Sequence, residues 1–272
     1  MADNRVSVGS GFERGVGKAL GSNHAFFLLS ALLFVASAAG TIAWSASMSK
    51  MSGMAWTAAW HVFGSVMRGG AVYLTMWDTM MMAMMLPTLV PMLWRYRSNL
   101  AGTRAGNPGL STFVAGAAYF LVWTLFGMTL FLLTSAITVL EFHHVVLARI
   151  APIVNGALIV VAGAFQFTAW KERHLDCCRA LAAVDHPRLL ADDGSAVRHG
   201  LHLGINCVCS SGGLMVILVL LSAMDLRVMV AITIALAVER LTPAAYRAAR
   251  IIGVLAVAAG LARIAMAAGV II

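Results

Sequence analysis

The stretch Met76–Pro87, which reads MWDTMMMAMMLP, decides how this sequence folds. It is apolar enough for a membrane helix, yet it holds six methionines and one aspartate instead of the Leu, Ile and Val that face lipid. An acidic side chain inside a membrane span is costly unless it is paired or solvated. We therefore expect Asp78 to face a cavity or the interior of a helical bundle.

Helical periodicity places these side chains on two adjacent faces of the helix. One face holds Asp78, Met81, Met82 and Met85, and the other holds Met76, Met80 and Met84. Thioether sulfur is a soft, neutral ligand that suits Cu(I) and that hard cations reject. The alternative is that methionine, being flexible, fills irregular gaps in a packed interior. The sequence leaves both interpretations open, a metal site or core packing.

The composition places this stretch in a polytopic membrane protein. Of the 272 residues, 61% are hydrophobic and 11% are charged, whereas a soluble domain carries about 25% charged residues. Long apolar runs without period-two alternation indicate helices and exclude a barrel. The sequence therefore predicts an all-α transmembrane bundle of about seven helices. They are expected at about 24–47, 70–94, 111–140, 150–170, 203–221, 226–241 and 249–272.

The remaining segments are assigned around these spans. Residues 1–23 are expected as a cytoplasmic tail, and residues 24–272 as a single helical membrane domain. Within that domain, 171–202 is expected as a polar cytoplasmic loop. The segment 48–70 is apolar but interrupted by glycine, serine and histidine, so we expect it to lie on the outer surface as an interfacial helix.

The net charge of +8 follows from membrane orientation and not from nucleic-acid binding. The basic residues lie in short loops beside the apolar runs, and most of them fall on alternate loops. Because Lys and Arg concentrate on the cytoplasmic side of membrane proteins, this distribution places the N-terminus in the cytoplasm. The partners implied are membrane lipid and a metal ion, with no nucleic acid.

The four cysteines form a second group of candidate soft ligands. His174 precedes Cys177 and Cys178 by three and four residues, so on a helix either pair could bind one ion. Three histidines, His174, His199 and His202, flank the group. The alternative is a set of unrelated buried thiols, because free cysteine packs as a small hydrophobe. All four map to the cytoplasmic side, where structural disulfides are not expected.

Cys207 and Cys209 raise a question of helix geometry. Residues two apart point to opposite sides of a helix, so the pair could bind one ion only where the chain is unwound. Otherwise Cys207 continues a stripe through Ser211 to Met215. Nearby, Glu239 and Arg240 end an apolar run, and we read them as a helix end whose charges snorkel to the membrane surface. No Ser/His/Asp constellation and no phosphate-binding glycine loop is present in the sequence, so an enzyme is not expected.

Three blocks of the sequence resemble a known family. They read W-x-x-M-x-x-A-M-M-x-P, then G-x-x-Q-x-T-x-x-K followed by cysteine, then a cysteine element followed by Leu-Met and a Glu-Arg end. The residues that carry them are Trp77, Met80, Ala83, Met84, Met85 and Pro87; Gly163, Gln166, Thr168, Lys171 and Cys178; and Cys207, Leu214, Met215, Met224, Asp225, Glu239 and Arg240. In this order and spacing, the chain resembles bacterial predicted metal-binding integral membrane proteins of unknown function, some of which are called copper chaperones.

The resemblance implies metal binding in the bacterial inner (cytoplasmic) membrane and says little about mechanism. The chain departs from the family where it has His174 in place of an earlier cysteine. It also has Ser210, Ser211 and Gly212 in place of a Cys-Cys-Trp run, with an extra Cys209. A mixture of cysteine and histidine still suits copper, and zinc as a second choice.

These observations predict a membrane protein that binds Cu(I) through Met, Cys and His. It would pass the ion across or along the membrane by ligand exchange, in contact with a soluble copper carrier or a membrane cuproenzyme that receives the metal. The residues expected to bind the metal are Asp78, Met80, Met81, Met84, Met85, His174, Cys177, Cys178, Cys207, Cys209 and Met215. Two rival interpretations are a structural or assembly subunit of a membrane cuproenzyme and an integral membrane oxidoreductase or haem protein.

Overall fold

A computed structural model of the chain describes residues 6–49, 66–101, 107–143, 145–183, 193–222, 225–242 and 245–271. Over these ranges the protein consists of eight α-helices and contains no strand, which confirms the expected all-α class. The helices are α1 (Val6–Ser49), α3 (Val66–Ala101), α4 (Pro108–His143), α5 (Val145–Phe165), α6 (Ala169–Ala183), α7 (Asp193–Ser222), α8 (Leu226–Leu241) and α9 (Ala245–Ile271). Most of the expected interfacial segment, residues 50–65, lies outside the described residues.

Five helices of the described ranges are long and apolar enough to cross a membrane. They contain the segments Asn23–Ser47, Gly69–Leu100, Pro108–Leu140, Ser195–Leu221 and Ala245–Gly269. The pair α5 and α6 makes a sixth candidate if it is one span, bent by 61° at its break. The expected number of about seven is therefore reduced to five or six. The helix α8 has only 16 residues, whereas a span needs about 20, and α5 counts as a span only together with α6.

The segment 171–202, expected as a polar loop, is largely helical. The helix α6 runs from Ala169 to Ala183 and α7 begins at Asp193. The reason is visible in α6, where Lys171, Leu175 and Cys178 are buried at i, i+4 and i+7 while Arg173 is exposed. Such a helix has one buried face and a polar outer face, so its mean hydropathy resembles that of a loop.

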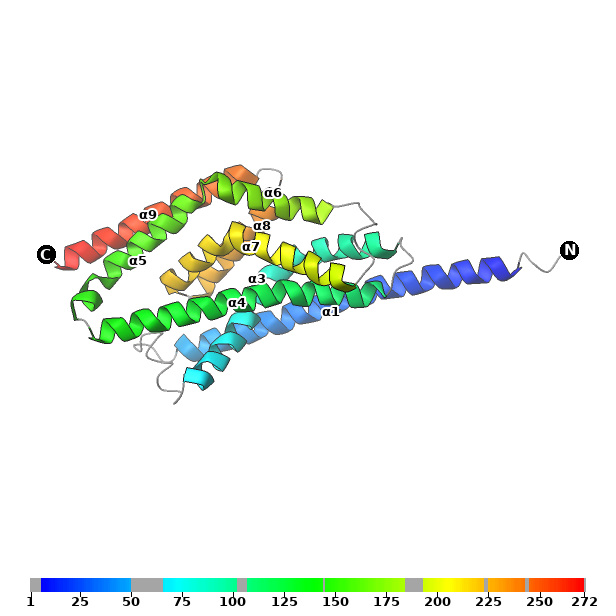
Figure 1. The fold of residues 1–272 in the computed structure, drawn as a ribbon, viewed down its shortest axis with the longest axis horizontal. Coiled ribbons are helices and arrows are strands. Elements are labelled where there is room, and N and C mark those ends of the chain that lie inside the picture. Colours follow the sequence, from blue (N-terminus) through cyan, green and yellow to red (C-terminus); the bar gives the residue numbers. More distant parts are fainter. Residues whose placement is uncertain are drawn as a thin grey trace.

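The helix α3 is one of the two central helices of the described bundle, with α7, and packs against α1, α4, α6 and α8 (Figure 1). Its Trp77 is buried, and the indole Nε1 donates a hydrogen bond to the Trp123 carbonyl of α4 at 3.0 Å. Gly127 on α4 makes room for this ring, because a Cβ atom there would lie 2.4 Å from it. The two helices therefore fix the face that α3 turns to the interior.

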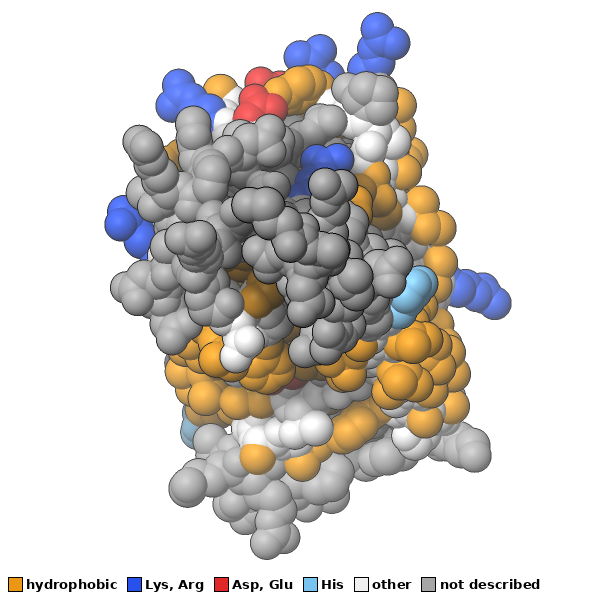
Figure 2. All heavy atoms as spheres, turned by 90° about the vertical axis from the view of Figure 1, so that its right-hand side faces the viewer, with side chains coloured by type: hydrophobic (Ala, Val, Ile, Leu, Met, Phe, Trp, Pro, Cys, Tyr) orange, Lys and Arg blue, Asp and Glu red, His pale blue; other side chains and the backbone are white. Residues whose placement is uncertain are grey.

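The outer surface is apolar along the lengths of the helices. Large hydrophobic side chains are exposed on α1, α4 and α9, as expected for helices that face lipid. Figure 2 looks onto the end of the molecule at the right-hand side of Figure 1. Hydrophobic side chains cover its flanks, and basic side chains, all of them arginine in the described residues, stand at its margin. The arginines with exposed side chains among the described residues include Arg95, Arg173, Arg198, Arg247 and Arg250.

Candidate metal-binding centre

The thiol of Cys207 lies at the centre of a buried polar cluster between α4, α7 and α8. Arg240 donates from Nη2 to the Cys207 sulfur at 2.7 Å, and the hydroxyl of Tyr119 lies 2.9 Å from the same sulfur. All three residues are buried. A buried guanidinium needs a counter-charge, because it stays protonated. Cysteine supplies such a charge when it binds a metal, since the metal ligand is the thiolate.

The guanidinium of Arg240 also connects this thiol to the methionine helix. Its Nη2 lies 3.1 Å from the hydroxyl oxygen of Ser211 on α7. Its Nη1 lies 3.4 Å from the Thr88 hydroxyl and 4.0 Å from the Met85 sulfur, both on α3. One planar guanidinium thus contacts both a thiol of α7 and a thioether of α3 inside the bundle.

A second thiol belongs to the same cluster. Cys178 of α6 is buried and lies close enough to Arg240, Cys207 and Ser210 to interact electrostatically with each. Cys207 and Met85 thus contact the guanidinium directly, and Cys178 interacts with it electrostatically. Sulfur donors of this kind form a soft ligand set, which suits Cu(I).

A buried ion pair supports the cluster from one side. The Lys171 ammonium lies 2.7 Å from the Glu239 carboxylate, with both side chains at most 2% exposed, and it also donates to the amide oxygen of Gln166. Glu239 precedes Arg240 in α8, so the pair fixes the helix turn from which Arg240 projects. In the described part of the chain, Lys171, Glu239 and Arg240 are the three buried charged residues, and together they carry one net positive charge.

The methionines of α3 lie inside the bundle and not against lipid. Met80, Met81, Met84 and Met85 are at most 2% exposed, and Met215 of α7 is fully buried. Asp78 is half-buried and accepts a hydrogen bond from the Thr124 hydroxyl at 2.9 Å, so it contacts α4. Of the residues expected on this helix, Met85 is the one in contact with the thiol cluster.

Other expected ligands are not brought to the cluster. Cys177 is exposed and Cys209 is half-buried, because α6 and α7 continue unbroken through these positions and turn both side chains away from the buried faces that hold Cys178 and Cys207. The His174 ring nitrogen Nδ1 is 2.8 Å from the Asn206 side-chain oxygen on α7. Among residues whose placement is described, no three His, Cys, Asp or Glu side chains are grouped closely enough to hold a metal ion. A metal in the buried cluster would therefore need thioether sulfur as well as thiols.

The sequence interpretation of Glu239 and Arg240 as a snorkelling helix end was wrong. Both side chains point inward, and Arg240 is the hub of the cluster. Tyr119 and Lys171 were also not identified as cluster residues. A charged pair within an apolar run was the available signal, because an ionisable residue at membrane depth is normally paired and functional.

One comparison with known proteins identifies a family. The sequence model of a family described as "PpoB2: Copper chaperone" matches residues 74–263. The matched region begins in α3 before the methionine run and ends in α9, so it contains every residue of the buried cluster. No curated protein and no solved structure gave a significant match to the chain.

Proposed function

The chain belongs to this copper chaperone family, and from that premise we propose that it is a multi-pass membrane protein that carries Cu(I) as cargo. The ion binds to the thiolates of Cys178 and Cys207 with the thioether of Met85, and it leaves by exchange to the sulfur ligands of a partner. The protein acts as a carrier and not as an enzyme.

The observation that carries this proposal is the contact between Arg240 and Cys207 inside the bundle. Two thiolates that hold one Cu(I) ion form a complex with one net negative charge. Lys171, Glu239 and Arg240 together have one net positive charge, so the loaded centre is neutral overall. Neutrality matters here because an uncompensated charge in a low-dielectric interior is strongly unfavourable.

The same charge balance favours Cu(I) over Zn²⁺. A zinc ion held by the same two thiolates forms a neutral complex and leaves the positive charge of the three buried residues unbalanced. Zinc also prefers four ligands in tetrahedral geometry, whereas the described residues offer two thiols and one thioether here. Copper in its reduced state is therefore the cargo that fits this donor set.

The buried methionines of α3 provide weaker ligands on the way to the thiols. Met80, Met81 and Met84 lie within one and a half helical turns of Met85 and are all buried. A neutral thioether releases Cu(I) more readily than a thiolate, so an ion moving along α3 meets stronger ligands at Cys207. The exposed arginines at the margin of the end shown in Figure 2 indicate which end faces the cytoplasm. A soluble copper carrier or a membrane cuproenzyme is the partner expected.

The experiment is a Cu(I) competition titration on purified protein in detergent, under reducing and anaerobic conditions. A chromophoric Cu(I) chelator competes for the ion, and elemental analysis counts the bound copper. We expect Cys207→Ser and Cys178→Ser each to weaken Cu(I) binding at least tenfold. The matched control is Cys177→Ser, a cysteine next to Cys178 in sequence but exposed in the structure, and it should bind as the wild type does. Equal affinity in all three variants would disprove the buried thiol site.

One observation favours a second function, a structural subunit of a membrane cuproenzyme without its own metal site. Met81, Met85 and Met215 are fully buried, and methionine is a good filler of irregular gaps. Under this alternative the purified protein binds no copper, and replacement of both buried cysteines by serine leaves its retention in a larger complex unchanged. Copper content and co-purification therefore separate the two functions.

A further inference from the structure

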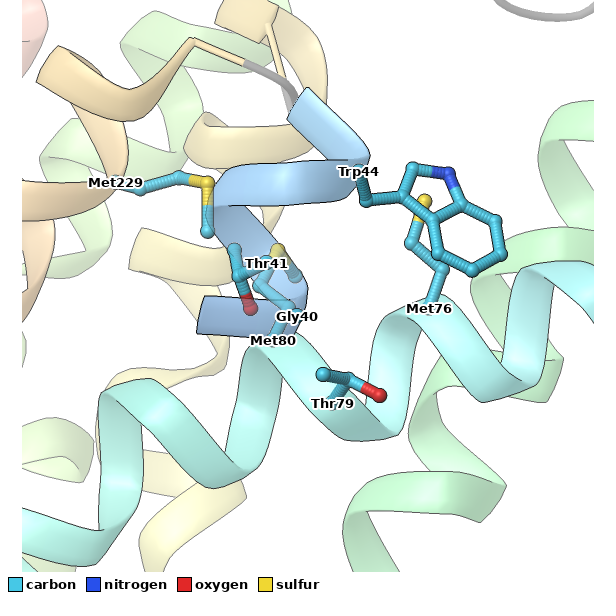
Figure 3. Close-up of a pocket in the computed structure, with 7 residues that line it drawn as sticks. All are labelled: Gly40, Thr41, Trp44, Met76, Thr79, Met80 and Met229. Atoms are coloured by element: carbon cyan, nitrogen blue, oxygen red, sulfur yellow. The ribbon is translucent and has the colours of Figure 1, made fainter. Parts of the chain in front are cut away.

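A second group of thioethers lies outside the buried thiol centre, in a pocket between α1, α3 and α8 (Figure 3). Three methionines line it, Met76 and Met80 from α3 and Met229 from α8. The other lining residues are Gly40, Thr41, Trp44 and Thr79. The cavity measures about 10 Å³, which is about the space of one water molecule or one small ion.

The donor chemistry of this pocket is selective. Its lining includes no carboxylate, imidazole or thiol, so it offers thioether sulfur and two threonine hydroxyls. Hard divalent cations need oxygen ligands and charge, whereas a soft monovalent cation is satisfied by neutral sulfur. Methionine has three rotatable bonds, so the sulfurs of Met76, Met80 and Met229 can adjust to an ion between the helices.

The helix α1 adds an aromatic ring to the lining of the pocket. Gly40 allows α1 to approach α3, because a Cβ atom there would lie 3.2 Å from the Thr79 methyl group. One turn further along α1, Trp44 lines the same pocket. The face of an indole ring attracts a cation, so Trp44 adds a favourable contact for a positive ion without adding a charge.

The pocket lies on a defined path to the thiol centre. Along α3, Met80 precedes Met85 by five residues, which is a rise of about 7.5 Å. Along α8, Met229 lies near the first residue of the helix and Arg240 near the last. The two helices that line the pocket therefore also lead to the cluster of Cys207, and along α3 the buried Met81 and Met84 lie between Met80 and Met85 in the sequence.

We propose that Met76, Met80 and Met229 form a distinct Cu(I) site that loads the ion before it reaches Cys178 and Cys207. This inference rests on the proposed function, since it assumes that Cu(I) is the cargo. Met229 is the decisive residue, because it is far from the methionine run in sequence and only the packing of α8 on α3 brings it to the pocket. The site binds more weakly than the thiol centre, because its three donors are neutral.

The test measures Cu(I) stoichiometry and affinity in four proteins by chelator competition under reducing conditions. They are the wild type, the double variant Cys178→Ser/Cys207→Ser, this double variant with Met229→Leu, and the double variant with Met92→Leu. Met92 is a buried methionine of α3 that does not line the pocket, so it controls for the loss of any methionine. We expect two Cu(I) per wild-type chain, one weaker Cu(I) in the double variant, none after Met229→Leu and one after Met92→Leu.

A second measurement checks the pocket independently of stoichiometry. Cu(I) bound beside Trp44 should quench part of the tryptophan fluorescence, and that part should be absent in Trp44→Phe. Elution as a monodisperse peak and an unchanged melting temperature show that each variant is folded, and Leu for Met conserves side-chain volume.

The outcomes of the two proposals can be told apart. A double cysteine variant that binds no copper, or that keeps its copper after Met229→Leu, overturns the thioether site and leaves the thiol centre in place. Copper binding in the double cysteine variant with the stoichiometry and affinity of the wild type, lost when Met229→Leu is added, overturns the thiol centre and supports the thioether site.

Discussion

The Nη2 atom of Arg240 lies 2.7 Å from the Cys207 sulfur, although the two residues are 33 positions apart on different helices. Both are buried, so neither can exchange its partner for water. An arginine placed on a thiol in this way supplies the charge that an anionic metal complex needs, and its planar guanidinium reaches Met85 and Ser211 at the same time.

Removal of the Arg240 charge should weaken Cu(I) binding. In Arg240→Gln the copper dithiolate loses its counter-charge, and residues behind metal ligands typically contribute about 10- to 100-fold in affinity. Arg240→Lys keeps the charge but loses the planar guanidinium that reaches both Cys207 and Thr88. Its affinity for Cu(I) should therefore lie between those of the wild type and Arg240→Gln. Chelator competition measures all three proteins, and a Gln variant that binds Cu(I) as tightly as the wild type would contradict the charge-balance argument.

The membrane-spanning helices were predictable from the sequence, because contact with lipid requires long apolar segments. The helices α3, α4 and α9 were expected from their apolar runs, because a span needs about 20 apolar residues whatever it packs against. The helix α6 was taken for a loop, because its Lys171 is buried only through pairing with Glu239. That pairing is a tertiary contact between distant segments and leaves no trace in local hydropathy.

The sequence predicted the chemical type of the candidate ligands but not which of these residues lie together. Local composition pointed to soft ligands, since methionine and cysteine were enriched in two regions. Which of them meet depends on helix rotation, and α6 turns Cys178 inward while its neighbour Cys177 is exposed. Arg240 was read as a surface charge, because nothing near it in sequence shows that Cys207 lies opposite. The ligand roles themselves stay predictions until copper binding is measured.

The hydroxyl of Tyr119 should stabilise the empty centre more than the loaded one. It lies 2.9 Å from the Cys207 sulfur in a fully buried position, and a buried hydrogen bond contributes about 1 kcal/mol. We expect Tyr119→Phe to lower the free energy of unfolding of the copper-free protein by about that amount, as measured by thermal melts in detergent. Because the arginine contact remains, Cu(I) affinity should change less than in Arg240→Gln. A larger loss of Cu(I) affinity in Tyr119→Phe than in Arg240→Gln would show that Arg240 does not supply the counter-charge.

Substitutions of Lys171 and Glu239 should have strongly non-additive effects on the stability of the protein. Breaking a buried pair by removing one partner costs about 3–5 kcal/mol, because a charge is left alone in the interior. We therefore expect Lys171→Met and Glu239→Gln each to lower the melting temperature markedly. The double variant leaves neither charge unpaired, so it should be more stable than the sum of the two single changes predicts. Additive losses would show that the two side chains act independently.

The contact of Gly127 with Trp77 should be required for the packing of α4 on α3. A Cβ atom at Gly127 would lie 2.4 Å from the indole ring, which is itself buried and hydrogen-bonded to Trp123. We expect Gly127→Ala to lower the free energy of unfolding by about 1–3 kcal/mol through overpacking. Gly269→Ala in α9 is the matched control, because no atom would lie within 4 Å of its new Cβ, and removing a helical glycine is mildly stabilising. If the two variants have the same melting temperature, the indole ring has room to move, and this interface does not hold the methionine face of α3 toward the interior.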